Sequence, residues 1–260
     1  MTEKTSETLF NNLNPILMKK FIYLLVLTPA FLNNGCSSLT LEVQTMELMI
    51  ARDVSKSVGD RCFPLDTALF NNILSIIELT DDVVYFEKGI ECSFSYIGAD
   101  YRPLVSHVTL EPGSHVALDN IRSRKKKIAI FKSQLLQAAH QLMQMPSDHA
   151  STFINSSLCY QFEVMRESSF SNDHRLILMT DGIQEGEGVN FVAQPIAPES
   201  YEEITRQLNE QCAFGDLSTF DITILACPPE GLTEASYAST AYWLLRFKEA
   251  GASARIRSNL

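Results

Sequence analysis

Five oxygen-bearing side chains from three distant parts of the chain could form one cation site. They are Asp53, Ser55 and Ser57 in the segment Arg-Asp-Val-Ser-Lys-Ser, Thr152 in Ala-Ser-Thr-Phe-Ile, and Asp181 in Met-Thr-Asp-Gly. Two carboxylates and three hydroxyls are all hard oxygen donors, which suit a small divalent cation such as Mg²⁺. These residue types predict binding of a metal ion rather than a nucleophile or a general base.

The segments around these residues predict how they could meet. Residues 46–51 form an apolar, strand-like run that ends just before Asp53, and residues 176–179 form another that ends just before Asp181. Ligands in open α/β sheets bind beyond the carboxyl ends of the strands. We therefore expect the two aspartates at one rim of a parallel sheet, with Thr152 placed beside them.

Strand-like and helix-like segments alternate along the rest of the chain. Strands are expected over residues 43–51, 83–86, 90–97, 104–110, 175–179 and 220–227, where 83–86 and 90–97 are either two paired strands or one bent strand. Helices are expected over 66–79, 127–145, 152–166, 199–212 and 234–250. Such alternation favours a three-layer α/β fold whose central, mostly parallel sheet carries helices on both faces. Residues 104–110 alternate in polarity before a Pro-Gly turn, which is typical of an edge strand.

The three polar segments together resemble the von Willebrand factor type A domain and its metal-ion-dependent adhesion site. Asp53-x-Ser55-x-Ser57 is similar to the first motif of that site, residues 150–158 look like its threonine loop, and residues 176–182 look like the strand that ends in Thr-Asp-Gly. The resemblance extends over almost the whole chain beyond residue 43. It implies the same three-layer, Rossmann-like fold.

The resemblance also implies a role for each site residue. Asp53 and Ser57 would hold Mg²⁺ directly, with Mn²⁺ and Ca²⁺ as alternatives, and Asp181 would bind it directly or through water. Ser55 and Thr152 complete the expected ligand set. An acidic residue of a protein partner would then fill the remaining coordination position.

Three departures from the family pattern leave a second interpretation open. Arg52 stands where an aliphatic residue is usual, Lys56 where glycine is common, and Ala150 and Ser151 replace small glycines. Lys56 could weaken cation affinity through like-charge repulsion. The alternatives are a metal-free scaffold of the same fold that serves assembly of an envelope or transfer complex, and a polar turn in which Asp53 and its serines only cap the backbone.

Enzymatic interpretations have less support. Ser55 stands where a haloacid-dehalogenase-like phosphatase needs its second aspartate, and neither a Gly-x-Ser-x-Gly elbow nor a His-Glu-x-x-His motif occurs. We expect a binding module and not an enzyme, with a hydrolase as the minor alternative.

The amino-terminal region has the features of an export signal. Lys19 and Lys20 precede an apolar run over residues 21–32, which is too short to span a bilayer. The following Gly35 and Cys36 resemble a bacterial lipoprotein signal, in which the cysteine becomes the lipidated first residue. This predicts export and a lipid anchor in a bacterial cell envelope membrane, with a plain secretory signal as the alternative.

The expected organisation has three parts. Residues 1–35 form an upstream segment and signal, residues 36–42 a short linker, and residues 43–260 the binding domain. Translation could start at Met1 or at Met18, the methionine that directly precedes the two lysines.

The net charge and the cysteine content of the chain limit which partners we expect and whether disulfides can form. The chain carries −10, and residues 1–35 contribute +1, which argues against nucleic acid as a partner. The one basic cluster, residues 122–127, is expected to lead into the following helix, with contact to an anionic lipid surface or an acidic partner as the alternative. Five cysteines follow Cys36, so one or two disulfides would leave at least one thiol; the sequence does not choose the pairing.

Overall fold

The computed structural model describes most of the chain from Thr45 onward. The described residues are 45–58, 63–64, 67–79, 88–98, 104–113, 121–147, 149–167, 171–194 and 196–258. The predicted signal segment, Cys36, the linker and the expected strand over 83–86 lie outside these residues.

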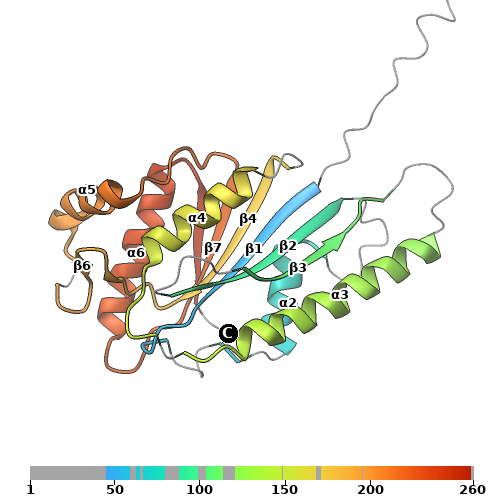
Figure 1. The fold of residues 1–260 in the computed structure, drawn as a ribbon, viewed down its shortest axis with the longest axis horizontal. Helices are drawn as coiled ribbons and strands as arrows, with labels where there is room; N and C mark the ends of the chain where they lie inside the picture. The colour runs from blue at the N-terminus through green and yellow to red at the C-terminus, as the bar shows by residue number, and fades with distance from the viewer. Residues whose placement is uncertain are drawn as a thin grey trace, which may run out of the picture. The chain divides into compact units, whose positions relative to one another are not determined.

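A six-stranded sheet forms the centre of the domain (Figure 1), with the strand order β3-β2-β1-β4-β7-β8. All neighbouring pairs are parallel except β2 and β3, which are antiparallel. The strands are β1 (Thr45–Asp53), β2 (Gly89–Ile97), β3 (Leu104–Leu110), β4 (Asp173–Thr180), β7 (Phe220–Ala226) and β8 (Ser253–Ser258). The mostly parallel sheet and the antiparallel edge strand β3 are therefore confirmed.

Helices cover both faces of the sheet, because successive side chains of a buried strand point to opposite sides. In β1, Met46, Leu48 and Ile50 join the core beneath α2 and α3, whereas Met49 and Ala51 join the core beneath α4 and α6. The helices are α2 (Thr67–Ile76), α3 (Ile121–Met143), α4 (Ile154–Glu167), α5 (Tyr201–Gln211) and α6 (Thr233–Glu249). This confirms the predicted three-layer α/β architecture with a mostly parallel central sheet.

Several element boundaries differ from the sequence prediction. Helix α3 begins at Ile121, so the basic cluster belongs to the helix and is not a lead-in to it. Strand β8 was not expected, because its six residues contain a single β-branched side chain, Ile256. The expected loop over 182–198 contains a small hairpin, β5 (Glu185–Gly186) with β6 (Val189–Asn190), and is followed by the short helix η1 (Pro198–Ser200).

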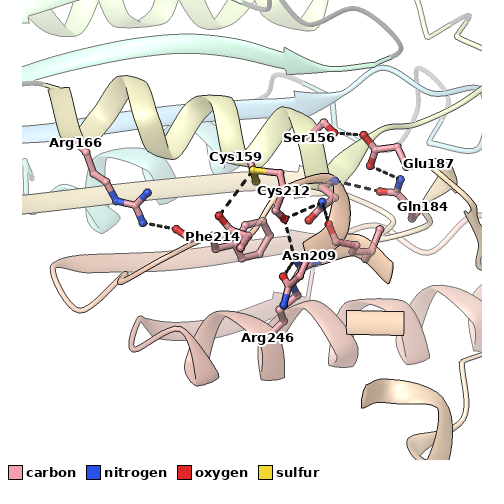
Figure 2. The surroundings of a disulfide bond; sticks show 12 residues. Ser156, Cys159, Arg166, Gln184, Glu187, Asn209, Cys212, Phe214 and Arg246 are labelled. Atoms are coloured by element: carbon pink, nitrogen blue, oxygen red, sulfur yellow. Dashed lines mark hydrogen bonds between the residues drawn. A yellow bond between two sulfur atoms is a disulfide. The ribbon is translucent and has the colours of Figure 1, made fainter. Parts of the chain in front are cut away.

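The described cysteines include both disulfide-bonded residues and a free thiol, as the odd number of cysteines after Cys36 predicted. Cys159 of α4 is bonded to Cys212 at the end of α5 (Figure 2), and Cys227 is also disulfide-bonded. Cys92 is a free thiol buried in β2. Among the helices that the structure describes, none is long and apolar enough to cross a membrane.

Arg52, the unusual residue before the aspartate, closes the end of α3. Its side chain is 2% exposed, and Nη1 donates to the carbonyl oxygens of Leu142 at 3.1 Å and Met145 at 2.7 Å. Nη2 donates to the hydroxyl of Ser147 at 2.9 Å. The last carbonyls of a helix have no partner within the helix, and a cation near them also complements the helix dipole. Arg52 therefore fastens α3 to the end of β1 beside Asp53.

We expect Arg52→Leu to lower the free energy of unfolding by about 2–4 kcal/mol, because buried carbonyls would lose a charged donor. Urea denaturation of both proteins measures this difference. Arg255→Leu is the matched control: Arg255 is 42% exposed and pairs with Asp221 at 3.2 Å, so its loss should cost less than about 1 kcal/mol. Equal losses in the two variants would contradict the capping role.

Candidate metal centre

The predicted site lies where the order of the sheet reverses. From β1 the chain proceeds outward to β2 and β3, whereas from β4 it proceeds outward on the other side to β7 and β8. A crevice beyond the strand ends forms at such a switch point. Asp53 is the last residue of β1 and Asp181 directly follows β4, and the two strands are paired up to Arg52 and Met179. The two aspartates therefore flank the switch point.

Backbone hydrogen bonds join the three predicted segments to one another. The Lys56 amide donates to the His149 carbonyl at 3.1 Å, and the His149 amide donates to the Val54 carbonyl at 3.4 Å. The Thr152 amide donates to the Glu185 carbonyl at 3.2 Å, and the Glu185 amide donates back at 3.1 Å. The segment 149–152 thus bridges the Asp53 loop and the loop after Asp181. The structure brings all five predicted residues to this rim, and their role as ligands stays a prediction.

Each aspartate carboxylate is buried and held by a local donor. The Ser55 amide donates to Asp53 Oδ1 at 2.8 Å, and the Thr180 hydroxyl donates to Asp53 Oδ2 at 2.7 Å. The Ile183 amide donates to Asp181 Oδ1 at 2.8 Å. Asp181 Oδ2 is buried and has no hydrogen-bond partner in the described part of the chain. One carboxylate oxygen is therefore left for a further group.

Burial raises the pKa values of both carboxyl groups, and the charge of Asp53 also raises the pKa of Asp181. Burial raises the pKa of Asp53, while hydrogen bonds from Thr180 and Ser55 oppose the change. Burial and then the charge of Asp53 raise the pKa of Asp181 to about 7, although the nearby Ser57 hydroxyl and the Ile183 amide oppose the shift. Two carboxylates that disfavour each other's charge need a cation or a proton between them.

Arg52 and Lys56, the two basic residues of the first motif, lie differently relative to the aspartate pair. Arg52 donates to the end of α3. Lys56 is exposed to solvent, where its charge is screened more strongly than a buried charge would be. The hydroxyl oxygens of Ser55 and Ser57 lie 3.0 Å apart beside the carboxylates. The departures from the family pattern thus leave the donor atoms in place.

Helix α6 supports the loop that carries Asp181. The Ser236 hydroxyl donates to the Asp181 carbonyl at 2.6 Å, and Trp243 Nε1 donates to the Gly182 carbonyl at 2.9 Å. Gly182 has a φ of +78°, and a Cβ atom there would lie 2.8 Å from the hydroxyl oxygen of Thr240. Only glycine combines this conformation with so close an approach. Sequence reasoning missed Ser236 and Thr240, whose i, i+4 spacing within a helix was the available signal.

Gln184 and Asn155 support the threonine loop in a similar way. The side-chain carbonyl of Gln184 accepts the Asn155 amide at 3.1 Å, and Asn155 Nδ2 donates to the Leu208 carbonyl at 2.9 Å. Figure 2 shows Gln184 beside Glu187, which accepts hydrogen bonds from Gln184 and from the Ser156 hydroxyl. The nearby Cys159–Cys212 disulfide links the same helices. These residues were also missed, because no motif distinguishes them from ordinary polar surface residues.

The donor set fits a hard cation better than a softer metal. Within the described residues, no group of three or more His, Cys, Asp or Glu side chains could hold a metal ion. The rim instead offers two carboxylates and neutral hydroxyls, together with the buried Oδ2 atom that lacks a partner. These oxygen donors suit Mg²⁺, Mn²⁺ or Ca²⁺.

A separate cavity of about 540 Å³ lies between α5 and α6 and contains none of the predicted site residues. Its lining includes Tyr201, Tyr242 and the buried Arg246, whose guanidinium group lies 4.1 Å from the centre of the Phe214 ring. Cavity size would thus place a binding site between α5 and α6, whereas the chemistry of the side chains places it at the rim of the sheet. The rim is the better candidate, because it combines converging donors with perturbed carboxyl groups.

Comparisons with known proteins give distant structural similarity. No protein-family model and no curated protein sequence matches the chain. The human COPII-coat protein Sec24c is 11% identical over 84% of this chain, with a TM-score of 0.41, and this chain spans only 30% of its length. An aerotolerance-related membrane protein of Bacteroides fragilis is 14% identical over 72% of this chain and 73% of its own, with a TM-score of 0.28. Manganese-loaded TRAP protein of Plasmodium vivax is 14% identical over 74% of this chain and 61% of its own, also with a TM-score of 0.28. These TM-scores are below 0.5, so the assignment of the site depends on its own geometry.

We expect Asp181→Asn to stabilise the metal-free protein in a pH-dependent manner. The folded-state pKa of about 7 lies above the ordinary value of 3.8, so the folded state binds the proton more tightly than the unfolded state. The stability of the wild type should therefore fall as the pH rises from about 4 to 7, and the variant should escape this loss. The variant's advantage in Tm should be small near pH 4 and about 3–6 °C at pH 8.

Thermal unfolding in buffer with a chelator measures this effect. Glu163→Gln is the control, because Glu163 is an exposed carboxylate on α4. A constant Tm difference between wild type and Asp181→Asn across this pH range would show that Asp181 is not the titrating group.

Proposed function

We propose that this protein is a lipid-anchored binding module of the bacterial envelope or cell surface. In this proposal it resembles the von Willebrand factor A family in engaging a protein partner through a divalent cation at the rim formed by Asp53, Ser55, Ser57, Thr152 and Asp181. The observation that carries the proposal is the buried pair of aspartates at the switch point of the sheet, with Asp181 Oδ2 left without a donor.

A bound cation would relieve the repulsion between the two carboxylates and fill the position beside Asp181 Oδ2. Asp53, Asp181 and the serine hydroxyls would hold it, with Mg²⁺ as the expected ion and Mn²⁺ or Ca²⁺ as alternatives. Because the hydroxyl ligands are neutral, the ion would keep positive charge and attract a carboxylate from a partner. This chemistry is recognition, and we propose no catalytic role for the five residues.

The proposal of export and lipid anchoring depends on the cysteines and not on the geometry of the rim. The bonded cysteines support an oxidising compartment, because disulfides persist mainly in exported proteins. Cys36 supplies the proposed site of lipid attachment, directly after the apolar run of the signal.

A metal-free scaffold is the second candidate, and one observation favours it. Since the pKa of Asp181 is about 7, a proton can neutralise the aspartate pair near neutral pH without a cation. In that case the rim would be a structural feature, and the domain would serve assembly of an envelope or transfer complex through other surfaces.

The response of the Tm to Mg²⁺ separates the two candidates. Binding to the folded state alone raises stability by mass action, so Mg²⁺ at about 100 times its Kd should raise the Tm of the wild type by about 5–10 °C. Asp53→Asn should abolish this response while keeping acceptors for the Ser55 amide and the Thr180 hydroxyl. Thr152→Val should retain the fold and alter affinity for the partner.

Glu163→Gln serves again as the control and should respond like the wild type. A wild-type Tm that does not change at millimolar Mg²⁺, Mn²⁺ or Ca²⁺ would reject the metal mechanism and favour the scaffold.

The anchor is tested at Cys36. Cys36→Ala should move the protein from the membrane fraction to the soluble exported fraction, or leave the signal uncleaved, because no thiol remains for lipid attachment. Fractionation and intact-mass measurement of both proteins show the change. A variant identical to the wild type in mass and in fractionation would exclude a lipidated Cys36.

A further inference from the structure

The cavity between α5 and α6 has a buried positive charge in its wall. Arg246 lines this cavity and is 4% exposed. Its Nη2 atom donates to the side-chain oxygen of Asn209 at 2.8 Å and to the Cys212 carbonyl at 3.4 Å (Figure 2), and both acceptors are neutral. Its Nη1 atom is buried and has no hydrogen-bond partner in the described part of the chain. The guanidinium charge is therefore removed from water without a counter-charge bonded to it, which is costly.

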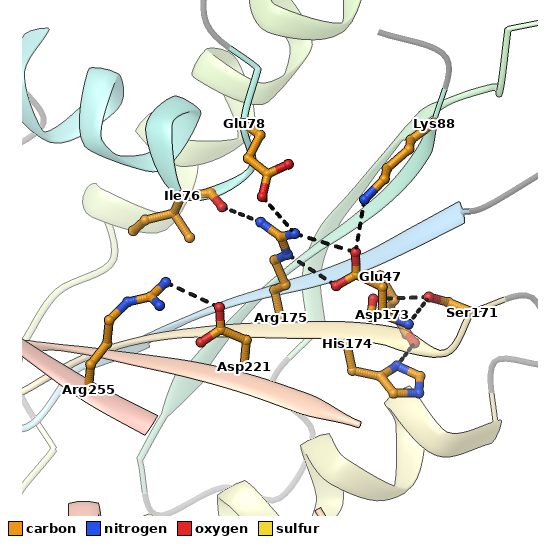
Figure 3. A network of polar contacts seen from close by, with 10 residues as sticks. All are labelled: Glu47, Ile76, Glu78, Lys88, Ser171, Asp173, His174, Arg175, Asp221 and Arg255. Carbon is orange, nitrogen blue, oxygen red and sulfur yellow. Dashed lines mark hydrogen bonds and ion pairs between the residues drawn. The ribbon is translucent and has the colours of Figure 1, made fainter. Parts of the chain in front are cut away.

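Arg175 shows how another largely buried arginine of this domain is neutralised. Its side chain is 11% exposed, and it binds Asp173 and Glu78 at 3.1 Å each (Figure 3). Among the described residues, no carboxylate forms such a pair with Arg246. The guanidinium of Arg246 also lies 4.1 Å from the centre of the Phe214 ring, but this contact uses its face and not its N–H groups. An anionic group in the cavity would supply the missing counter-charge.

Neutral donors in the same wall can bind such a group. Because the Asn209 oxygen accepts from Arg246, the Nδ2 atom of that amide is left for a further acceptor. The hydroxyl oxygens of Thr205 and Tyr242 lie 3.1 Å apart, and only one of their two protons can lie between them. Burial raises the pKa of Tyr242, so its hydroxyl keeps its proton. An amide and a hydroxyl with a buried cation beside them suit a single carboxylate.

The solvent side of the cavity has the opposite charge. Glu202 and Glu249 line it and are exposed. Arg206 also lines it, but this arginine is bonded to Glu203 and Glu210. The charges of Glu202 and Glu249 are therefore left for a cationic group. A doubly negative ligand would be repelled at this entrance, whereas a ligand with one charge of each sign would not.

Apolar surface lies within the same cavity. The rings of Tyr201 and Tyr242 are in edge contact with their centres 5.4 Å apart, and Leu245 is 41% exposed. Tyr242, Arg246 and Glu249 recur at the i, i+4 and i+7 positions of α6, so they lie on one face of the helix. Residues three apart leave a helix about 5–6 Å from each other. The cation and the nearest acid of the cavity are thus separated by a distance that the two charged ends of a small molecule can span.

We propose that this cavity binds a small zwitterion with an apolar body, such as an aromatic amino acid or a dipeptide. Its carboxylate accepts from Asn209 and the hydroxyl pair beside Arg246, and its ammonium group lies at Glu249. The volume of about 540 Å³ is in the range of small-molecule sites. The cavity contains none of the five rim residues, so this proposal depends neither on the metal ion nor on the lipid anchor.

The test is calorimetric titration of the full chain with Cys36→Ala, which requires no detergent. Alanyl-phenylalanine and phenylalanine should both bind, the dipeptide more tightly because it buries more apolar surface. The carboxyl-terminal amide of the dipeptide should bind about 30-fold more weakly, since its hydrogen bonds are no longer charge-assisted. The N-acetyl dipeptide should bind about 3-fold more weakly, because the glutamates are exposed. Tighter binding of phenylalanine would identify a free amino acid as the ligand.

Arginine variants locate the site. Arg246→Gln should weaken binding of the dipeptide about 30-fold. Arg166→Gln is the matched control: Arg166 donates to the carbonyls of Phe214 and Asp216 and lies over the Phe220 ring, but it does not line the cavity. This control removes an arginine that fastens the same loop and should bind the dipeptide like its parent.

Glu249→Gln tests the other end of the cavity without disturbing the fold, because Glu249 is exposed. It should weaken binding about 3-fold, whereas Glu234→Gln, an exposed glutamate of α6 outside the cavity, should not. Equal affinity for the dipeptide and its amide, equal losses in the two arginine variants, or no binding of either probe at millimolar concentration would overturn the proposal. If Arg246→Gln does not fold, the amide and the glutamate variants still decide. The Tm response to Mg²⁺ should be unchanged in Glu249→Gln, so either proposal can fail without the other.

Discussion

The repulsion between Asp53 and Asp181 is the constraint around which the domain is arranged. Two acidic side chains are brought together in a buried position, where burial raises the pKa of both and the charge of Asp53 makes Asp181 harder to ionise. Proteins keep such pairs where they serve a ligand, since hydrophobic side chains of similar volume would stabilise the fold more. The surrounding structure supplies what holds them: strand ends fix the two backbones, and short hydrogen bonds orient three of the four carboxylate oxygens.

Elements far from the rim contribute to this arrangement through single contacts. Arg52 connects the residue before Asp53 to the end of α3, and Ser236 connects the carbonyl of Asp181 to α6. Gln184 connects the threonine loop to the loop after β4. Helices of both layers thus form hydrogen bonds to the same short segments at the rim, so the geometry of the site depends on both layers.

The architecture could be predicted well because strands that are buried on both faces appear in the sequence as continuous apolar runs. Long apolar runs such as 46–51 and 176–179 specify central strands, and their polar ends specify a rim. Strand β8 escaped prediction because an edge strand at the end of the chain needs few apolar residues; its pairing with β7 depends on long-range contact. The role of Arg52 was also missed. The sequence shows a charge beside an aspartate, and only the tertiary structure shows that its hydrogen-bond acceptors lie about ninety residues away.

The central position of β1 has a mechanical consequence. The chain enters the domain at Thr45, and Asp53 stands at the far end of the same strand. A pull between an anchored entry point and a partner held at the rim would therefore act along β1. This strand is paired in parallel along nine residues with β2 and along seven with β4. Because both points lie on one strand, such a load would pass along the covalent backbone of β1, and the two ladders would keep the strand in its place in the sheet. In such an arrangement the hydrogen bonds of the sheet would carry little of the load.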